Sequence, residues 1–439
     1  MCAKFNNNKY KISPCIILAL MSLFSFSMQA AEIKVIHAGQ LLTVPGKTVL
    51  NKQTIVVTDN IITDIQSGFV RAKEIDKAAR LIDLKDSFVM PGLMDMHVHL
   101  QFEYGANNTS DRLKLSAEDK AMQSVSFAKK TLLAGFTTVR DLGGNPQPLY
   151  ALRNGINKGW IDGPRIIAAG RVSVTGGHLD VDGMRHDLIE KYSPSSLCDG
   201  AMECRKVTRN AIKYGADMIK IASTGGVLSD TNTGTGQQMA DDELKEVVAT
   251  AHALGRKVAS HAHAADGINA ALRAGVDSIE HGSYADEDSI VLFKYSGAYL
   301  VPTLLAGDTV VNMAKTTDFM SEEIKAKAVL VGTDMLKNFN RAYQGGVKIA
   351  FGTDSGVSKH GTNAKEAVLM FNAGMAPMDI LKSATVNAAD LIDKSATLGT
   401  LENGKLADII AMDKNPLKDI SQLQRVGFVM KNGVVYKHQ

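Results

Sequence analysis

The sequence predicts an α/β protein: a (β/α)8 barrel with the TIM-barrel architecture, joined to a small β-sandwich made from both ends of the chain. Two observations predict the barrel. Stretches with helical character that end in glycine are followed by short apolar strands between residues 91 and 390, and the strands counted in this way number eight. A third observation predicts the sandwich, because short β-rich segments flank this region on both sides.

The repeating units of the middle region read helix, glycine, strand. Examples are LLAGFTTVRD, RAGVDSIEHG and YQGGVKIAFGTD. Glycine suits the left-handed residue after a helix, and a β-branched run suits a strand that is buried on both faces. With LMDMHVHL and PRIIAAGR added, eight parallel strands are expected to close into a barrel. The rival fold, an open doubly wound sheet, is disfavoured because no G-x-G-x-x-G follows an early strand.

The chain ends read as strands and turns. Residues 33–90 are rich in Val, Ile and Thr, with Gly, Asn and Asp at the breaks. Two short β-rich runs lie near the C-terminus, and Asn432-Gly433 in the second of them is a favourable hairpin turn. We therefore predict three parts: a signal peptide at 1–31, a β-sandwich domain of 32–90 plus 391–439, and a hydrolase barrel of 91–390.

The N-terminal segment has the layout of a secretory signal. Lys4, Lys9 and Lys11 precede an apolar run at 15–26, which ends in small residues at 27–31. The run is short for a membrane span, although an uncleaved anchor is the alternative. We expect cleavage, a secreted or periplasmic protein, and no stable membrane association once the signal is removed.

Charge and cysteine content change when this segment is removed. Its three lysines account for the whole formal net charge of +3, so the mature chain is neutral. With no basic patch interleaved with aromatic residues, the sequence argues against a nucleic-acid partner. Cys198 and Cys204 remain in what is expected to be an oxidising compartment. The sequence does not decide whether they form a disulfide or stay as two free thiols.

Polar residues that can bind metal fall at the ends of the predicted barrel strands, where active sites of such barrels lie. Residues two apart in a strand face the same side, so both histidines of His97-Val98-His99 point inward. Core packing explains one buried histidine more easily than four, because unpaired polar groups are costly to bury. The side chains suit zinc, with manganese, cobalt or iron as alternatives. The candidate metal ligands are His97, His99, Lys220, His261, His281 and Asp354.

Lys220 differs from the other candidates because it is a cation. Next to two metal ions its ammonium would be repelled and desolvated, so its pKa is expected to fall. As a neutral amine it can react with CO₂ to form a carbamate, an anionic and carboxylate-like bridge between two metals. The predicted cofactors are therefore two divalent metal ions, with Zn²⁺ favoured, and a CO₂-derived carbamate on Lys220.

The stretch 91–99, PGLMDMHVH, resembles the opening motif of the amidohydrolase superfamily, and the later lysine, histidines and aspartate follow in that family's order. More narrowly, the chain resembles the branch that holds imidazolonepropionase-like proteins and metal-dependent Xaa-Pro and Xaa-Arg/Lys dipeptidases. The segments 175–178, 222–226 and 260–263 carry this closer resemblance. It covers nearly all of the mature chain, including the β-rich ends.

The resemblance implies a role for each ligand. A hydroxide and the carbamylated lysine would bridge two metals, which together lower the pKa of bound water and polarise the scissile carbonyl. Asp354 would take the proton from the hydroxide and pass it to the leaving nitrogen. The first metal would be held by His97, His99 and Asp354, the second by His261 and His281, and both by Lys220.

Other polar residues are candidates for substrate contacts. The resemblance suggests that His178 touches the substrate, whereas a helix cap or a loop hydrogen bond is the structural alternative. Arg140 could orient ligands or bind a carboxylate, or form a structural ion pair with Asp141. His263 is expected to support its histidine neighbour rather than bind metal directly. The polar loop 225–238 is a candidate lid or an ordinary connection.

The favoured function is a metallopeptidase, a dipeptidase or carboxypeptidase that cleaves dipeptides or N-acyl amino acids through a metal-bridging hydroxide. Hydrolysis of a cyclic amide, as in imidazolonepropionase, or of a lactone is the alternative. A catalytically silent barrel that binds solute is a third class, which the complete ligand set disfavours. The partner is therefore a small molecule or a dipeptide. The substrate side chain, the identity of the metal and a homo-oligomeric state are left open by the sequence.

Overall fold

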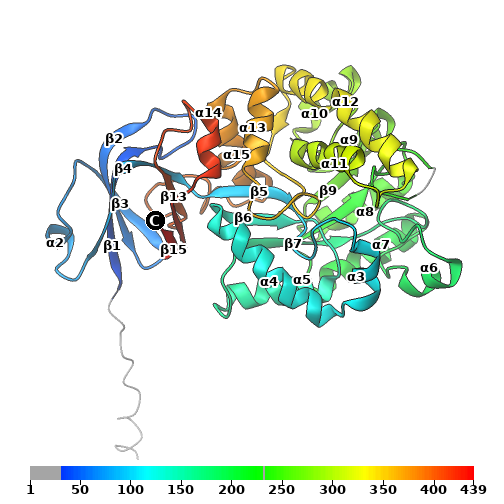
Figure 1. Ribbon diagram of the computed structural model, residues 1–439, viewed down its shortest axis with the longest axis horizontal. Coiled ribbons are helices and arrows are strands. Elements are labelled where there is room, and N and C mark those ends of the chain that lie inside the picture. The colour runs from blue at the N-terminus through cyan, green and yellow to red at the C-terminus, as the bar shows by residue number, and fades with distance from the viewer. Residues whose placement is uncertain (1–30, 231–232) are drawn as a thin grey trace, which may run out of the picture. The chain divides into compact units, whose positions relative to one another are not determined.

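The two ends of the chain form one seven-stranded sheet. The computed structural model describes residues 31–230 and 233–439, so all but the last residue of the predicted signal segment lies outside the described part. In Figure 1 the blue strands of the N-terminal end lie beside the dark red strands of the C-terminal end. The strands are β1 (Ile33–Leu41), β2 (Leu50–Thr58), β3 (Ile61–Ser67), β4 (Arg80–Pro91), β13 (Ile409–Met412), β14 (Phe428–Lys431) and β15 (Val434–His438).

The expected two-sheet sandwich takes the form of a single hydrogen-bonded sheet. Its order is β15-β14-β13-β4-β1-β2-β3. β4 is the cause, because it pairs in parallel with β1 on one side and antiparallel with β13 on the other, which joins the two chain ends in one ladder. The predicted hairpin turn is present: Asn432 and Gly433 have φ of 50° and 73°, as a type I′ turn requires, and they connect β14 to β15.

Eight parallel strands form the second sheet. Neighbours in the sheet are neighbours in the chain, in the order β12-β11-β10-β9-β8-β7-β6-β5. Their residues are nearly all buried, as expected for strands covered on both faces. The strands are β5 (Leu93–Val98), β6 (Phe136–Asp141), β7 (Arg165–Arg171), β8 (Met218–Ala222), β9 (Val258–Ala262), β10 (Ser278–His281), β11 (Tyr299–Val301) and β12 (Lys348–Ile349).

The parallel sheet curls, and backbone hydrogen bonds connect its first strand to the chain that follows its last. Met96 N donates to Phe351 O at 2.8 Å, Asp354 N to His97 O at 2.7 Å, and His99 N to Ser355 O at 2.7 Å. These bonds place the segment after β12 directly beside the end of β5.

Helices connect the strands, as the helix–glycine–strand pattern predicts. Gly275 and Gly297 end two of these helices in the left-handed conformation, with φ of 94° and 72°. The main connecting helices are α4 (Ala117–Leu133), α5 (Pro146–Asn157), α7 (Ala201–Lys213), α8 (Asp241–Ala253), α9 (Ala265–Ala274), α10 (Glu287–Ser296), α11 (Leu304–Thr316) and α12 (Glu322–Gln344). The others are α2 (Ala72–Ile75), α3 (Asn108–Lys114), α6 (His186–Tyr192), α13 (Lys365–Asn372), α14 (Pro377–Ser383), α15 (Val386–Leu391) and the 3-10 helix Ile420–Gln424.

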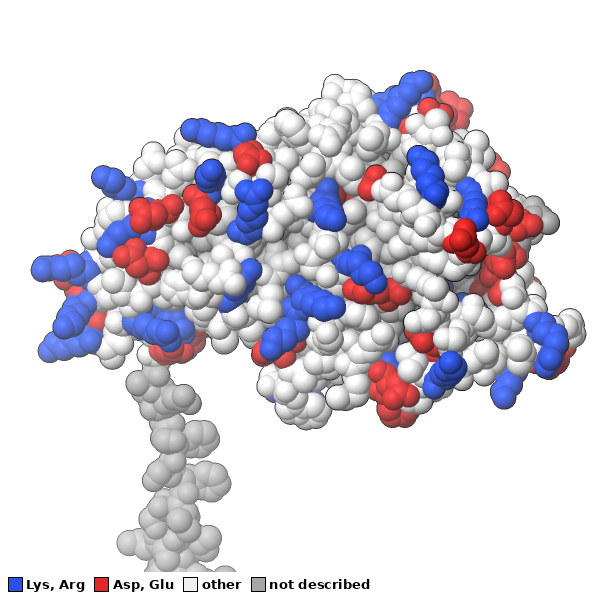
Figure 2. Space-filling view, in the orientation of Figure 1, with Lys and Arg blue, Asp and Glu red and all other residues white. Residues whose placement is uncertain are grey.

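Charged side chains of both signs are mixed on one face of the molecule. Figure 2 shows acidic and basic residues interspersed on the face drawn, with no broad area of one sign. Within the described ranges, no helix is both long enough and apolar enough to cross a membrane.

Candidate metal centre

The structure brings all six predicted ligands to one cavity at the carboxyl ends of the parallel strands. The cavity has a volume of about 400 Å³. His178 and His263 also line it, whereas Arg140 does not. The ligands in its wall are His97, His99, Lys220, His261, His281 and Asp354.

Two histidines of β5 and the segment just after it point toward one carboxylate. His97 Nε2 lies 3.5 Å and His99 Nε2 lies 3.3 Å from the same oxygen of Asp354, Oδ1. His99 Nδ1 lies 2.8 Å from the backbone oxygen of Gly143, to which it donates. That bond fixes the proton of His99 on Nδ1 and leaves the Nε2 lone pair facing Asp354, as a metal ligand requires.

Ligand atoms gather in two overlapping groups. One comprises His97, His281 and Asp354, and the other His261, His263 and His281, with the ligand atoms of each group within 4.8 Å of one another. His281 belongs to both groups and donates or accepts through Nδ1 with Thr303 Oγ1 at 2.6 Å. His263 therefore stands closer to the ligand set than the sequence suggests. The sequence contains an indication of this position, since His263 lies two residues after His261 and residues two apart in a strand face the same side.

Two of the candidate ligands, Lys220 and Asp354, each carry a buried polar atom without a hydrogen-bond partner among the described residues. Lys220 Nζ and Asp354 Oδ1 are buried, and neither forms a hydrogen bond with any residue that the structure describes. Burial lowers the pKa of Lys220 to about 8 and raises the pKa of Asp354 to about 8. Buried orphan atoms of this kind are costly, so the donor set, with its histidines and carboxylate, fits the binding of metal.

The backbone is strained where the ligands sit. His281, Thr303 and Asp354 have positive φ values of 71°, 51° and 54°, which cost energy in residues that carry a Cβ, above all in a β-branched threonine. Such conformations cluster at functional sites, where surrounding contacts hold them.

Arg140 is held in buried contacts within the protein and does not line the cavity, and the substrate contact considered from the sequence stays a prediction. Its Nη2 donates to Glu280 Oε1 at 2.7 Å, its Nη1 to Ser278 Oγ at 3.0 Å and its Nε to Met96 O at 2.5 Å. The side chain is fully buried, and the residue is the last but one of β6. The partner considered in the sequence, Asp141, instead accepts from the backbone of Leu100 and Gly143.

Sequence reasoning did not identify Glu280, which connects this arginine to the metal ligands. Glu280 Oε2 lies 3.0 Å from His97 Nδ1, on the opposite side of the ring from Asp354. The carboxylate therefore orients the imidazole and fixes its proton on Nδ1. Glu280 is buried and precedes His281 directly, in the sequence SIEH. An acidic residue directly before a predicted ligand, in a strand expected to be buried, was the signal for it.

His178 stands against the second ligand group. Its ring is stacked on that of His261, with centroids 4.1 Å apart, and its Nδ1 lies 2.7 Å from Ser229 Oγ. Its backbone nitrogen donates to Gln238 Oε1 at 2.9 Å. Ser229 and Gln238 belong to the polar loop 225–238, in which 231 and 232 lie outside the described residues. The loop thus holds His178 in the cavity wall, to which it also contributes Val227 and Leu228.

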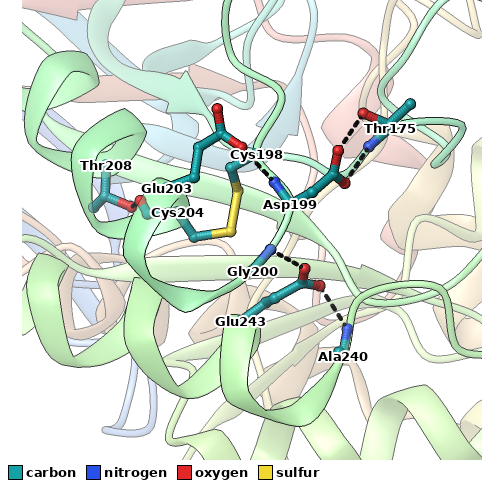
Figure 3. Close-up of a disulfide and its surroundings, with 9 residues drawn as sticks. All are labelled: Thr175, Cys198, Asp199, Gly200, Glu203, Cys204, Thr208, Ala240 and Glu243. Atoms are coloured by element: carbon teal, nitrogen blue, oxygen red, sulfur yellow. Dashed lines mark hydrogen bonds between the residues drawn. A yellow bond between two sulfur atoms is a disulfide. The ribbon is translucent and has the colours of Figure 1, made fainter.

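A disulfide braces the segment that carries His178. Cys198 and Cys204 are bonded, which answers the question that the sequence left open. Figure 3 shows the bond at the start of α7, beside Asp199, whose carboxylate accepts from both the backbone and the hydroxyl of Thr175. Cys198 N also donates to Ser173 O. Together with the bonds of Asp199 to Thr175, this bond attaches the segment that carries His178 to the residues just before α7.

A model described as the amidohydrolase family matches residues 88–436. Because the match spans most of the chain, the chain belongs to the amidohydrolase family, and the resemblance seen in the 91–99 motif is confirmed. Fold, site and family together support metal-dependent hydrolysis of an amide bond as the general activity.

Individual relatives narrow the comparison. A crystal structure of a Xaa-Pro dipeptidase with methionine bound in its active site is similar with a TM-score of 0.87 and 41% identity, over 92% of this chain and 100% of that one. Ochratoxinase of Aspergillus niger is 31% identical over 441 residues, covering 94% of this chain and 88% of that protein. Imidazolonepropionase of Fusobacterium nucleatum is 23% identical over 390 residues, covering 83% of this chain and 85% of that protein.

Proposed function

We propose that the protein is a binuclear metallohydrolase that cleaves linear amide bonds of dipeptides or N-acyl amino acids. One observation carries the proposal: six potential ligands converge on one cavity, and among them Lys220 Nζ and Asp354 Oδ1 are buried without hydrogen-bond partners in the described part of the chain. The similarity to a Xaa-Pro dipeptidase, at 41% identity over almost the whole chain, supports a peptide-like substrate over a cyclic amide.

The proposed centre would hold two zinc ions, with a carbamate on Lys220 as a further anionic ligand. Support comes from the two ligand groups, which share His281, and from the lowered pKa of the lysine. When bound, the ions would lower the pKa of a water molecule and polarise the scissile carbonyl. The first ion would be held by His97, His99 and Asp354, and the second by His261 and His281, with His263 close enough to take part.

The protein's own groups position the substrate and move the proton. Asp354 is placed to accept a proton at Oδ1 and to pass it to the leaving nitrogen, since this oxygen faces the cavity and accepts no hydrogen bond from the described residues. His178, oriented by Ser229, is placed to donate a hydrogen bond to the carbonyl oxygen of the substrate. The apolar wall of the cavity excludes bulk water from the reacting bond.

We further propose that residues 91–390 form a closed (β/α)8 barrel as the catalytic unit, and that 32–90 with 391–439 form its supporting domain. Backbone hydrogen bonds between β5 and residues 351–355 support closure of the barrel. Export through a cleaved signal at 1–31 is also proposed, and the disulfide, typical of oxidising compartments, supports it. N-terminal sequencing of the protein from the periplasm or medium tests the cleavage.

The test of function is amino-acid release from a library of free and N-acetylated dipeptides, with lactams and lactones as the comparison set. The mature protein would be loaded with zinc in bicarbonate buffer. Cleavage of linear amides that is abolished by a chelator is the expected result. Activity on cyclic amides or lactones alone would overturn the peptidase assignment, and no turnover in protein that holds two zinc ions would overturn the hydrolase assignment.

A further inference from the structure

An arginine in the wall of the cavity forms no salt bridge with any residue that the structure describes. Arg171 is the last residue of β7 and lines the cavity. Its Nε is buried and forms no hydrogen bond with the described residues, and none of the salt bridges among them includes its guanidinium. Burial lowers its pKa to about 10, so this cation is held in place against a desolvation cost. The carboxylate of Asp141 favours the cation electrostatically without forming a salt bridge to it, so the guanidinium can still pair directly with an anion that enters the cavity.

The position of Arg171 in the sheet sets where that anion must lie. In the register of β7 with β8, Arg171 is directly opposite Lys220, and opposed residues of parallel strands project from the same face. Its stem lies against Gly143, where an added Cβ would come within 2.6 Å of Arg171 Cγ. The same glycine accepts the bond that orients His99. The guanidinium is therefore close to the reacting centre and packed in a fixed position.

The rest of the cavity wall separates charge from apolar surface. Asp354 is the only acid in the described lining, and it already faces the ligand histidines. Arg112 and Lys120 add positive charge to the wall. The apolar part comes largely from α11, α12 and the chain after β12, with Val310, Met335 and Val357 among its residues.

We propose that Arg171 binds the α-carboxylate of the leaving amino acid, so that the enzyme prefers substrates with a free carboxylate one carbon away from the scissile nitrogen over the corresponding amides. The inference rests on the proposed amide hydrolysis and names the substrate class that the site accepts. An α-carboxylate fits because only the Cα separates it from the bond that breaks, which matches an arginine next to Lys220 in the sheet. A guanidinium also pairs with a carboxylate through two parallel hydrogen bonds.

Arg112 and Lys120 are expected to attract the substrate rather than to fix it. Arg112 is exposed and Lys120 is half-buried, so their contacts with an anion are screened by salt. They would raise the rate of encounter with anionic substrates. The ratio kcat/KM for a carboxylate substrate is therefore expected to fall with ionic strength, whereas kcat/KM for its amide is not.

The experiment compares N-acetyl-L-phenylalanine with its C-terminal amide, using zinc-loaded wild type, Arg171→Gln, Arg171→Lys and the control Arg273→Gln. Arg273 is exposed near the end of α9 and does not line this cavity, so the control removes the same charge elsewhere. We expect Arg171→Gln to raise KM for the acid about 10- to 100-fold, the size of a lost charge-assisted pair, and to leave the amide unchanged. Arg171→Lys should recover part of the preference, and the control should behave as wild type.

Equal losses on acid and amide, or loss of bound zinc from Arg171→Gln, would show that Arg171 supports the metal centre and would overturn the proposal. Wild type that prefers the amide would overturn it as well. If neither compound is hydrolysed, the proposed function fails separately, and the same pair is then titrated calorimetrically. Binding of the acid that is lost in Arg171→Gln would uphold the carboxylate site even then, whereas equal binding of acid and amide would reject it.

Discussion

Neighbouring residues on β10 have different tasks. Glu280 bonds the ring of His97 and the guanidinium of Arg140, while His281 reaches the cavity and belongs to both ligand groups. At this scale the sequence predicts the ligands well, because histidines at strand ends are rare and chemically distinctive. It does not predict the supporting contacts, since Glu280 and Arg140 are 140 residues apart and meet only after the sheet has formed.

Replacing Glu280 with glutamine tests its role as the link between arginine and ligand. The change leaves the buried Arg140 without its counter-charge, which costs about 3–5 kcal/mol of folding stability. It also removes the carboxylate that orients His97. Loss of such a partner typically weakens metal affinity by about 10- to 100-fold, and we expect the affinity for zinc to fall by roughly that factor. Chemical unfolding and zinc competition with a chelator measure the two effects. A variant with unchanged zinc affinity would refute the orienting role.

Asp354→Asn separates proton transfer from metal retention. The amide is nearly the same size as the carboxylate and keeps one oxygen toward the cavity, so most of the zinc should remain bound. The proton acceptor is lost, and we expect kcat to fall by about 10²- to 10⁴-fold, the usual contribution of general acid–base catalysis. Metal analysis and steady-state kinetics on the same preparation check this. Near wild-type kcat would remove Asp354 from the mechanism.

At the scale of elements, the helix–glycine–strand pattern anticipates most of the parallel sheet. It is least informative for β12, which has only two residues and makes its closing contacts through the irregular chain that follows. The pattern also identifies β-rich chain ends without revealing that β4 joins them in one sheet, because pairing partners are set by distant segments. Arg171 shows the same limit: PRIIAAGR places it at a strand end, but only the structure reveals that it lines the cavity and forms no salt bridge with the described residues.

Helices α7 and α8 are linked by an ion pair that makes stability depend on pH. Arg205 donates to both oxygens of Glu246 at 2.5 and 2.8 Å, and chiefly through these bonds it lowers the pKa of Glu246 from 4.5 to about 2. A carboxyl with a lowered pKa stabilises the fold above its ordinary pKa, and the contribution disappears as pH falls toward the folded value.

We therefore expect Arg205→Met to unfold at lower urea concentration than wild type at pH 7, with a difference that shrinks below about pH 4.5. The effect should be small, because the pair is partly exposed. Glu246→Gln serves as the control, since it should show the same reduced pH dependence. A difference between wild type and Arg205→Met that is constant from pH 7 to pH 3 would contradict this account.

At the scale of the whole described chain, the metal centre draws on most of the parallel sheet. Its candidate ligands come from β5, β8, β9 and β10 and from the segment after β12. Since ions that bind only the folded chain stabilise it by mass action, two zinc ions are expected to stabilise the whole sheet and not one loop.

Removal of the metals should therefore lower the melting temperature of the protein. At free zinc 100-fold above the dissociation constant, each site is expected to add about 2.7 kcal/mol. Calorimetry of chelated protein, titrated with zinc, measures the rise in Tm. Added bicarbonate should increase the rise in wild type but not in Lys220→Ala, because only wild type can form the carbamate. A Tm that does not respond to zinc would contradict binding at this centre.

The sheet made from both chain ends has a consequence for biosynthesis. β4 lies between β1, near the start of the described chain, and β13, which begins at Ile409. A ribosome releases β1 to β4 long before β13 to β15 exist, so one edge of β4 stays unpaired until synthesis is nearly complete. Exposed strand edges invite association with other chains. The seven-stranded sheet can therefore be completed only when synthesis of the chain is nearly finished.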